Sequence, residues 1–170
     1  MLSLSSCKNE TSAVDAINAP ILNYPLNEQR RANITYSDSG KNVLEIKAGL
    51  VQDYGNMEPP YTFFSNGLTV RFYNGRMLSS TVLNADTARQ EKSTDLWLIG
   101  GNVIVRNGKG DRLLTELLFW DKKEEKLYTD RKVQIETDGQ RIIGVGFEAD
   151  QEFNNYQIFS VQGELTIYDE

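Results

Sequence analysis

Apolar and polar residues alternate along most of the chain from Ala32 onward. The clearest stretch, Gly101–Asp130, reads GNVIVRNGKGDRLLTELLFWDKKEEKLYTD, with apolar side chains at every second position between Asn-Gly and Lys-Lys-Glu-Glu interruptions. A period of two is typical of strands that have one apolar and one polar face. The pattern therefore predicts an all-β chain whose charged residues gather in turns, notably Lys122–Lys126.

Turn signals divide the chain into hairpins. Ser39-Gly40 separates a strand at Ile34–Tyr36 from one at Val43–Ala48. Asn74-Gly75 is a strong two-residue hairpin signal, because a type I′ turn requires positive φ at both central residues. Asn84–Ser93 is expected to be a strand followed by a charged turn.

The same alternation predicts which side chains share a face of a strand. Two such sets are Leu113, Thr115, Leu117 and Phe119, and Ile143, Val145, Phe147 and Ala149. Gly144 and Gly146 lie between members of the second set, where a missing side chain permits sharp curvature. Repeated hairpins without helices predict one long antiparallel sheet that curves and folds over on itself as a roll.

Composition fits one domain preceded by a tether. The 170 residues are 39% hydrophobic and 25% charged, which is ordinary for a globular chain. Residues 8–31 show no sustained period and contain prolines, so we expect residues 1–31 to be a tether and 32–170 the β domain. Acidic residues outnumber basic ones by 24 to 18, which argues against nucleic acid as a partner.

The chain lacks the residue types of common active sites. It has no histidine and one cysteine, so no Ser-His-Asp triad, Cys-His pair or Cys-His zinc site is available. A glycosidase would need two carboxylates about 5 Å apart, and the candidates within predicted strands are Asp95, Glu116, Asp121 and Asp150. Exposed carboxylates are ordinary on β proteins, so we expect neither enzymatic activity nor a metal or cofactor.

The single cysteine lies in a recognisable context. Leu4-Ser5-Ser6-Cys7 matches the lipobox at which bacterial lipoprotein precursors are cleaved and their cysteine acylated. The preceding residues are too few to include the apolar core of a signal peptide. No stretch approaches the ~20 apolar residues of a membrane span, so we expect a lipidated Cys7 to be the anchor.

The order of several segments resembles one known family. The hallmarks are G-N-V-x-V, G-x-x-L-x-T-E-x-L-x-W-D, K-L-x-T-D and G-x-G-F-x-A-D, found at Gly101–Val105, Gly110–Asp121, Lys126–Asp130 and Gly144–Asp150. Together they resemble the LptC/OstA-like family of lipopolysaccharide export, over Ile34–Ile167. The resemblance implies an antiparallel β-jelly-roll, folded like an open taco, with a lipid-binding groove inside.

The resemblance also implies partners and a location. Proteins of this kind work in the periplasm, receive lipopolysaccharide from the inner-membrane ABC transporter LptB, LptF and LptG, and pass it by edge-strand addition to an LptA-like bridge protein. The typical enterobacterial member has a transmembrane helix, whereas this chain has a lipobox. We therefore expect a periplasmic lipoprotein tethered to the inner membrane through Cys7.

An apolar groove has a physical use for such a cargo, since exposing each acyl methylene to water costs about 0.8 kcal/mol. Phe64 falls where the family has a lining aromatic, and alternation supplies the other candidates. The expected groove residues are Phe64, Leu68, Val70, Val103, Val105, Phe119, Ile135, Val145, Phe147 and Ile158. Plain core packing gives the same pattern, and a shift of one residue exchanges the faces of a strand.

Two other functions stay open at this point. One is a scaffold or adaptor that binds partners through the same sheet edges and holds no lipid. The other is a carbohydrate-binding or hydrolytic jelly roll, for which Glu116 would be the first carboxylate to test.

Overall fold

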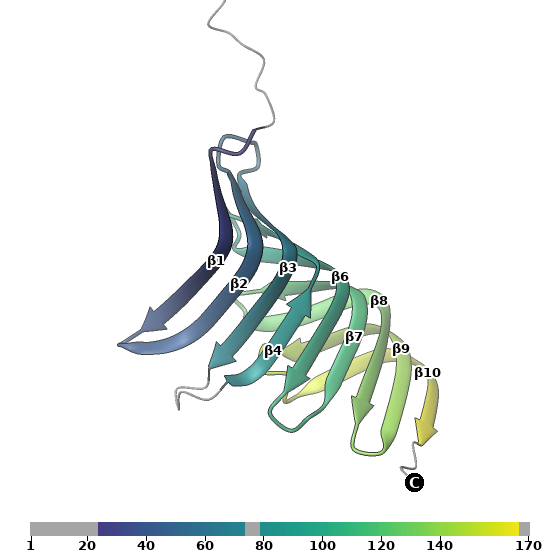
Figure 1. The fold of residues 1–170 in the computed structure, drawn as a ribbon. Helices are drawn as coiled ribbons and strands as arrows, with labels where there is room; N and C mark the ends of the chain where they lie inside the picture. The colour runs from purple at the N-terminus through teal and green to yellow at the C-terminus, as the bar shows by residue number, and fades with distance from the viewer. Residues whose placement is uncertain (1–23, 74–78, 167–170) are drawn as a thin grey trace, which may run out of the picture.

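A computed structural model describes residues 24–73 and 79–166, and these form one antiparallel sheet of ten strands (Figure 1). The strands are β1 (Asn27–Asp38), β2 (Lys41–Tyr54), β3 (Tyr61–Tyr73), β4 (Ser79–Ala85), β5 (Thr87–Glu91), β6 (Leu96–Asn107), β7 (Arg112–Asp121), β8 (Lys126–Thr137), β9 (Gln140–Asp150) and β10 (Tyr156–Thr166). Their order is β1-β2-β3-β4-β6-β7-β8-β9-β10, with β5 between β3 and β6. The predicted all-β, antiparallel jelly-roll class is confirmed.

The sheet folds over so that its two halves face each other, as the bent strands in Figure 1 show. β4 and β5 are two parts of one line, interrupted at Asp86, and both pair with β3 and β6. The β4 layer comprises β4 and the segments aligned with it, from Ala32–Asp38 to Ser160–Thr166. The β5 layer comprises β5 and its aligned segments, from Asn27–Arg30 to Tyr156–Ile158.

A line of backbone irregularities, here called the crease, separates the two layers. Register shifts occur between Ala48 and Leu50 in β2, Gly100 and Val103 in β6, Thr115 and Phe119 in β7, and Thr129 and Lys132 in β8. Positive φ angles on the crease occur at Arg31, Asn66, Gly67, Gly101, Asn102 and Gly146. Because a β-bulge bends its strand and increases the local twist, bulges aligned across neighbouring strands fold the whole sheet.

Asp86 stabilises the middle of the crease. Its backbone N–H donates to the Gly101 carbonyl at 2.9 Å, and its own carbonyl accepts from the Gly67 N–H at 3.2 Å. Its carboxylate accepts from Asn102 Nδ2 at 2.8 Å. At this point of the crease, the backbone groups of Gly67, Asp86 and Gly101 that face the interruption therefore have hydrogen-bond partners.

The first strand begins earlier than the sequence suggested. Residues Asn27–Arg30 pair with Leu50–Asp53, although they belong to the segment expected to be a linker. Asn27–Arg31 is polar and exposed at the sheet edge, so no apolar alternation marked it as a strand. The hairpin at Ser39-Gly40 is confirmed, whereas Asn74-Gly75 lies outside the described residues.

A chain of aromatic rings fills the space between the layers. Phe64 packs on Trp97 at 4.9 Å between ring centroids, Trp97 on Trp120 at 5.3 Å, and Trp120 on Phe72 at 5.2 Å. Phe72 belongs to the β4 layer and the other three rings to the β5 layer. All four are at most 4% exposed, so the interior is packed by the protein's own side chains.

Substitution of Gly49 tests the crease. A Cβ at this position would overlap the backbone carbonyl of Asn66, so we expect Gly49→Ala to destabilise the fold by about 1–3 kcal/mol in urea unfolding. Gly163→Ala in β10 is the matched control, because no atom lies within 4 Å of the Cβ that alanine would add there. Equal unfolding midpoints for the two variants would contradict a tightly packed crease.

Candidate functional site

The inner face of the β4 layer carries a continuous apolar row that crosses eight strands. Paired residues place one side chain of each strand in line: Ile34, Ile46, Val70, Leu83, Val105, Leu113, Ile135 and Ile142. Opposite residues of an antiparallel pair point to the same face. The row is therefore a strip of aliphatic surface that runs across the sheet, perpendicular to the strands.

Eight of the ten expected groove residues lie on the inner face. Seven are between 0% and 2% exposed: Phe64, Leu68, Val70, Val103, Val105, Ile135 and Phe147. Ile158 is partly buried, packs against the same core and pairs with Phe147. The structure thus brings these side chains into one apolar interior between the layers.

Phe119 and Val145 lie on the outer face, and their assignment to the groove was wrong. Phe119 pairs with Tyr128 and stacks on its ring at 5.1 Å, while the neighbouring Trp120 is 1% exposed. Val145 pairs with the exposed Lys132. The cause is the crease, because a bulge shifts the alternation of β7 and of β9 by one residue.

Alternation missed inner residues in β7 and in a turn. Leu118 and Trp120 replace Leu117 and Phe119 as the inward side chains of β7, and Phe153 in the β9–β10 turn is 0% exposed. The run Leu117–Trp120 contains four apolar residues in succession, which is the available signal that alternation fails there. Gly146, at φ +78°, marks the corresponding point in β9.

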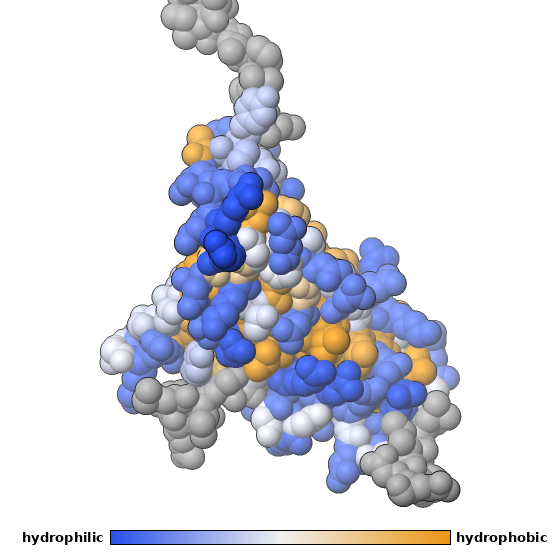
Figure 2. Space-filling view, viewed as in Figure 1, coloured by the Kyte–Doolittle hydropathy of each residue, from blue (hydrophilic) through white to orange (hydrophobic). Residues whose placement is uncertain are grey.

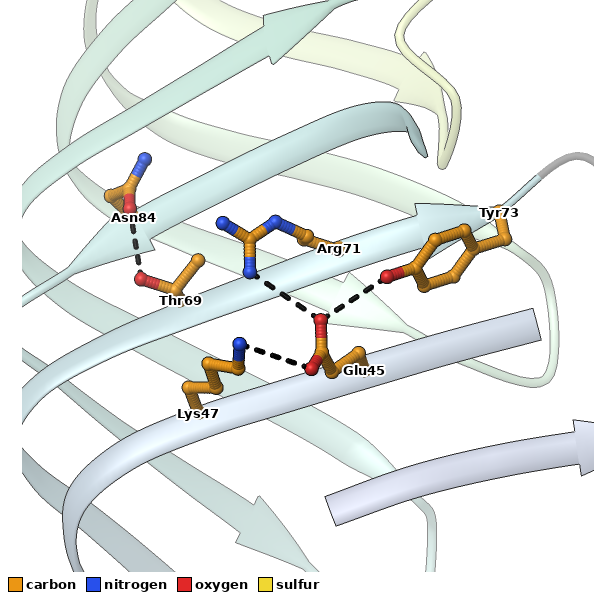
Figure 3. Close-up of polar contacts among 6 residues, drawn as sticks. All are labelled: Glu45, Lys47, Thr69, Arg71, Tyr73 and Asn84. Carbon is orange, nitrogen blue, oxygen red and sulfur yellow. Dashed lines mark hydrogen bonds and ion pairs between the residues drawn. The ribbon is translucent and has the colours of Figure 1, made fainter. Parts of the chain in front are cut away.

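The outer face of the β4 layer is held by charged side chains (Figure 3). Glu45 contacts Lys47 at 3.2 Å and Arg71 at 3.4 Å, and accepts a hydrogen bond from the Tyr73 hydroxyl at 3.1 Å. The line of paired residues that contains Glu45 and Arg71 continues across the sheet to Glu136. Glu136 forms ion pairs with Arg112 at 3.0 Å and with Arg141 at 3.3 Å. One face of this layer is therefore ionic and the other aliphatic.

The Glu45 cluster shifts the pKa of both of its acids. The bond from the Lys47 ammonium is the main cause that lowers the pKa of Glu45; burial opposes it, and Tyr73 and Arg71 lower the pKa further. Burial, followed by the bond to Glu45, raises the pKa of the Tyr73 hydroxyl. The cluster thus favours an ionised carboxylate beside a neutral phenol.

Three of the four carboxylates considered for catalysis have hydrogen bonds that order turns. Asp121 accepts from the backbone of Lys123 and Glu124, both at 3.0 Å, and Asp150 caps the β9–β10 turn. Burial raises the pKa of Asp95. Gln90 at 2.7 Å and Lys122 at 3.3 Å together lower the pKa by more than burial raises it, so the net shift is downward. The fourth, Glu116, is exposed.

A hollow of about 600 Å³ lies at the crease, where the ladder between β7 and β8 is interrupted. Ile104 and Leu114 contribute apolar surface to it, and Glu116 and Lys132 contribute charge. Figure 2 shows a band of apolar residues bordered by polar ones over β6 to β9. Within residues 24–73 and 79–166, no group of three or more His, Cys, Asp or Glu side chains is placed to hold a metal ion.

Comparison with protein-family models assigns the chain to a family. The family model described as "Lipopolysaccharide-assembly, LptC-related" matches residues 29–165, which span all ten strands. The chain belongs to this LptC-related family. The resemblance of the sequence motifs to LptC is thereby confirmed, while a search of the curated proteins finds no match.

Membership in the LptC-related family implies a role in lipopolysaccharide transport. Members of the family are periplasmic, inner-membrane-associated components of that machinery, and the family is not one of enzymes. The expected anchor Cys7 lies outside the described residues. The part of the chain that the structure describes has no helix that could cross a bilayer.

Two adjacent leucines test the inner and outer assignment in β7. Leu118 is 0% exposed on the inner face, so we expect Leu118→Ala to destabilise the protein by about 2–5 kcal/mol. Leu117 is half-buried on the outer face, and Leu117→Ala should cost roughly 1 kcal/mol. Denaturant unfolding measures both, and a larger loss for Leu117→Ala would reverse the assignment.

The Glu45 cluster predicts a dependence of stability on pH. Because the folded pKa of Glu45 lies below its unfolded value, its stabilisation is complete above the unfolded pKa and is lost as the pH falls through the folded pKa. We expect Glu45→Gln to unfold at a lower temperature than the wild type at pH 7. The difference should shrink in thermal scans at pH values below the normal range of a glutamate.

Proposed function

We propose that this protein carries lipopolysaccharide through the periplasm by holding its acyl chains between the β4 and β5 layers. The cargo arrives from the inner-membrane transporter LptB, LptF and LptG and leaves to an LptA-like bridge protein. The observation that carries the proposal is the uninterrupted aliphatic row from Ile34 to Ile142, combined with membership in the LptC-related family.

The energetics of the cargo favour such an interior. A dozen acyl methylenes exposed to water would cost roughly 10 kcal/mol, and an apolar trough offsets that cost wherever the chain lies along it. The row offers similar aliphatic side chains on successive strands, such as Val70, Val105 and Ile135. On a uniform surface of this kind, an acyl chain can slide because its binding free energy has no deep minimum at any one position.

The sheet edges support transfer by strand addition. β1 and β10 occupy the two ends of the strand order. An edge strand has unpaired backbone N–H and C=O groups that a neighbouring chain can complete. On β10, Phe159 and Val161 are 58% and 60% exposed, which adds apolar surface for a partner. We place the anchor at a lipidated Cys7, which would tether the domain to the inner membrane on the periplasmic side.

A scaffold that binds no lipid is the second candidate, and the packed interior favours it. Trp97, Trp120 and Phe64 fill the space between the layers and are at most 2% exposed. In this case the sheet edges would join the transporter to the bridge, and the lipid would travel elsewhere. The two functions differ in whether lipopolysaccharide contacts the inner face.

Two phenylalanines of the β5 layer, on opposite faces, separate the candidates. Replacing inner Phe64 or outer Phe119 by p-azidophenylalanine keeps the aromatic ring and adds a photoreactive azide at its para position. After irradiation in cells, we expect lipopolysaccharide adducts at position 64 and none at position 119. Immunoblotting of the purified protein for attached lipopolysaccharide measures the adducts.

The outcomes at the two positions are distinct. Protein adducts without lipid adducts at either position would overturn the lipid-carrying function and favour the scaffold. Equal lipid adducts at both positions would mean that lipid contacts the outer face as readily as the interior, which also contradicts the proposal.

A further inference from the structure

The turn between β9 and β10, Gln151–Asn155, is a preformed unit. The Asp150 carboxylate accepts from the backbone N–H of Asn154 at 2.9 Å and of Asn155 at 3.1 Å, and from Asn155 Nδ2 at 2.8 Å. The Phe153 N–H donates to the Asp150 carbonyl at 2.9 Å. These bonds lie within the turn or join it to Asp150, the last residue of β9, so the turn keeps its shape when it moves. The Gln151 N–H also donates to the Glu125 carbonyl at 2.8 Å, and this bond breaks when the turn moves.

Phe153 points from this turn into the apolar interior. It is 0% exposed, and its ring packs on Phe147 at 5.8 Å and on Tyr156 at 5.2 Å between centroids. Its φ of 53° is in the left-handed region, which a bulky aromatic residue rarely adopts. Burial of the ring therefore holds a backbone conformation that is intrinsically unfavourable.

The turn bridges the two layers on the side opposite the crease. We call this side the seam. The Thr81 hydroxyl of β4 donates to the Glu152 carbonyl at 2.6 Å. Asn107 Nδ2 of β6 donates to the Phe153 carbonyl at 2.9 Å. Thr81 and Asn107 belong to the β4 layer, whereas the turn extends from the β5 layer.

The seam has a cavity next to the turn. This cavity, of about 250 Å³, is lined by Leu44, Phe72 and Trp120 from the interior and by Gln151 from the turn. Lys122 also lines it and places its ammonium 4.6 Å from the centre of the Tyr36 ring, across the seam. An opening into the apolar interior is thus already present beside the turn.

We propose that Phe153 occupies an acyl-chain site and that the β9–β10 turn is a latch on the seam. When the latch moves away from the seam, the Phe153 ring leaves the space beside Phe147 and Tyr156. That space then becomes continuous with the neighbouring cavity. A saturated acyl chain then takes the place of the ring. The inference rests on the proposed function, because it specifies how the lipid reaches the interior.

A reversible disulfide tests the latch. In a full-length Cys7→Ser background, Thr81→Cys with Glu152→Cys joins the turn to β4 where these residues are already hydrogen-bonded. The purified protein is mixed with fluorescently labelled lipopolysaccharide, and binding is compared before and after oxidation. We expect oxidation to reduce binding at least tenfold and a reductant to restore it. Equal binding by the oxidised and reduced proteins would overturn the latch and leave the proposed function standing.

A second pair of variants weakens the latch instead of locking it. Thr81→Val removes the hydrogen bond to the turn, and we expect about fivefold faster capture of the labelled lipopolysaccharide. Thr69→Val is the matched control, since the Thr69 hydroxyl donates at 3.0 Å to Asn84 on the outer face. Equal capture rates for the two variants would contradict the latch, and failure of every variant and the wild type to bind would overturn the proposed function itself.

Discussion

The bend of the sheet at the crease is the constraint on which the rest of the molecule depends. A flat sheet of this length would expose one apolar face along its whole width, and aligned bulges let the two halves of that face cover each other. Asp86 supplies the hydrogen bonds that hold the break in the middle of the sheet, and Gly49 and Gly101 supply the space. Without the bend there would be no interior, no seam and no distinction between layers.

The crease also explains how far the sequence could predict the site. In β3, β6 and β8 the irregular segments leave the alternation unchanged, and the groove residues proposed there, such as Val70, Val105 and Ile135, lie inside. In β7 and β9 the bulges shift it, and Phe119 and Val145 lie outside. A period of two is a local property, whereas the position of a bulge depends on the neighbouring strands, so alternation could not place these two residues.

Two further features had no periodic signal. The start of β1 is polar because it forms an exposed edge, and pairing with β2 rather than burial makes it a strand. Phe153 lies in a turn, where an aromatic residue between polar neighbours predicts nothing by itself. Its burial results from the folding of one layer onto the other, which brings Thr81 and Asn107 to a turn far from them in the sequence.

The packed interior and the proposed lipid cargo are compatible on energetic grounds. Before lipid binds, the inner faces bury each other, and Phe153 fills the end of the space. A lipid that enters exchanges protein–protein contacts for protein–acyl contacts of similar apolar area, so the net gain is much smaller than the full free energy of burying the acyl chain. A carrier that must release its cargo to the next protein needs such a small difference, because a trough that stayed open to water would bind the lipid too tightly to pass it on. The self-packing that favours a scaffold on geometric grounds is therefore also what lets a carrier release its cargo.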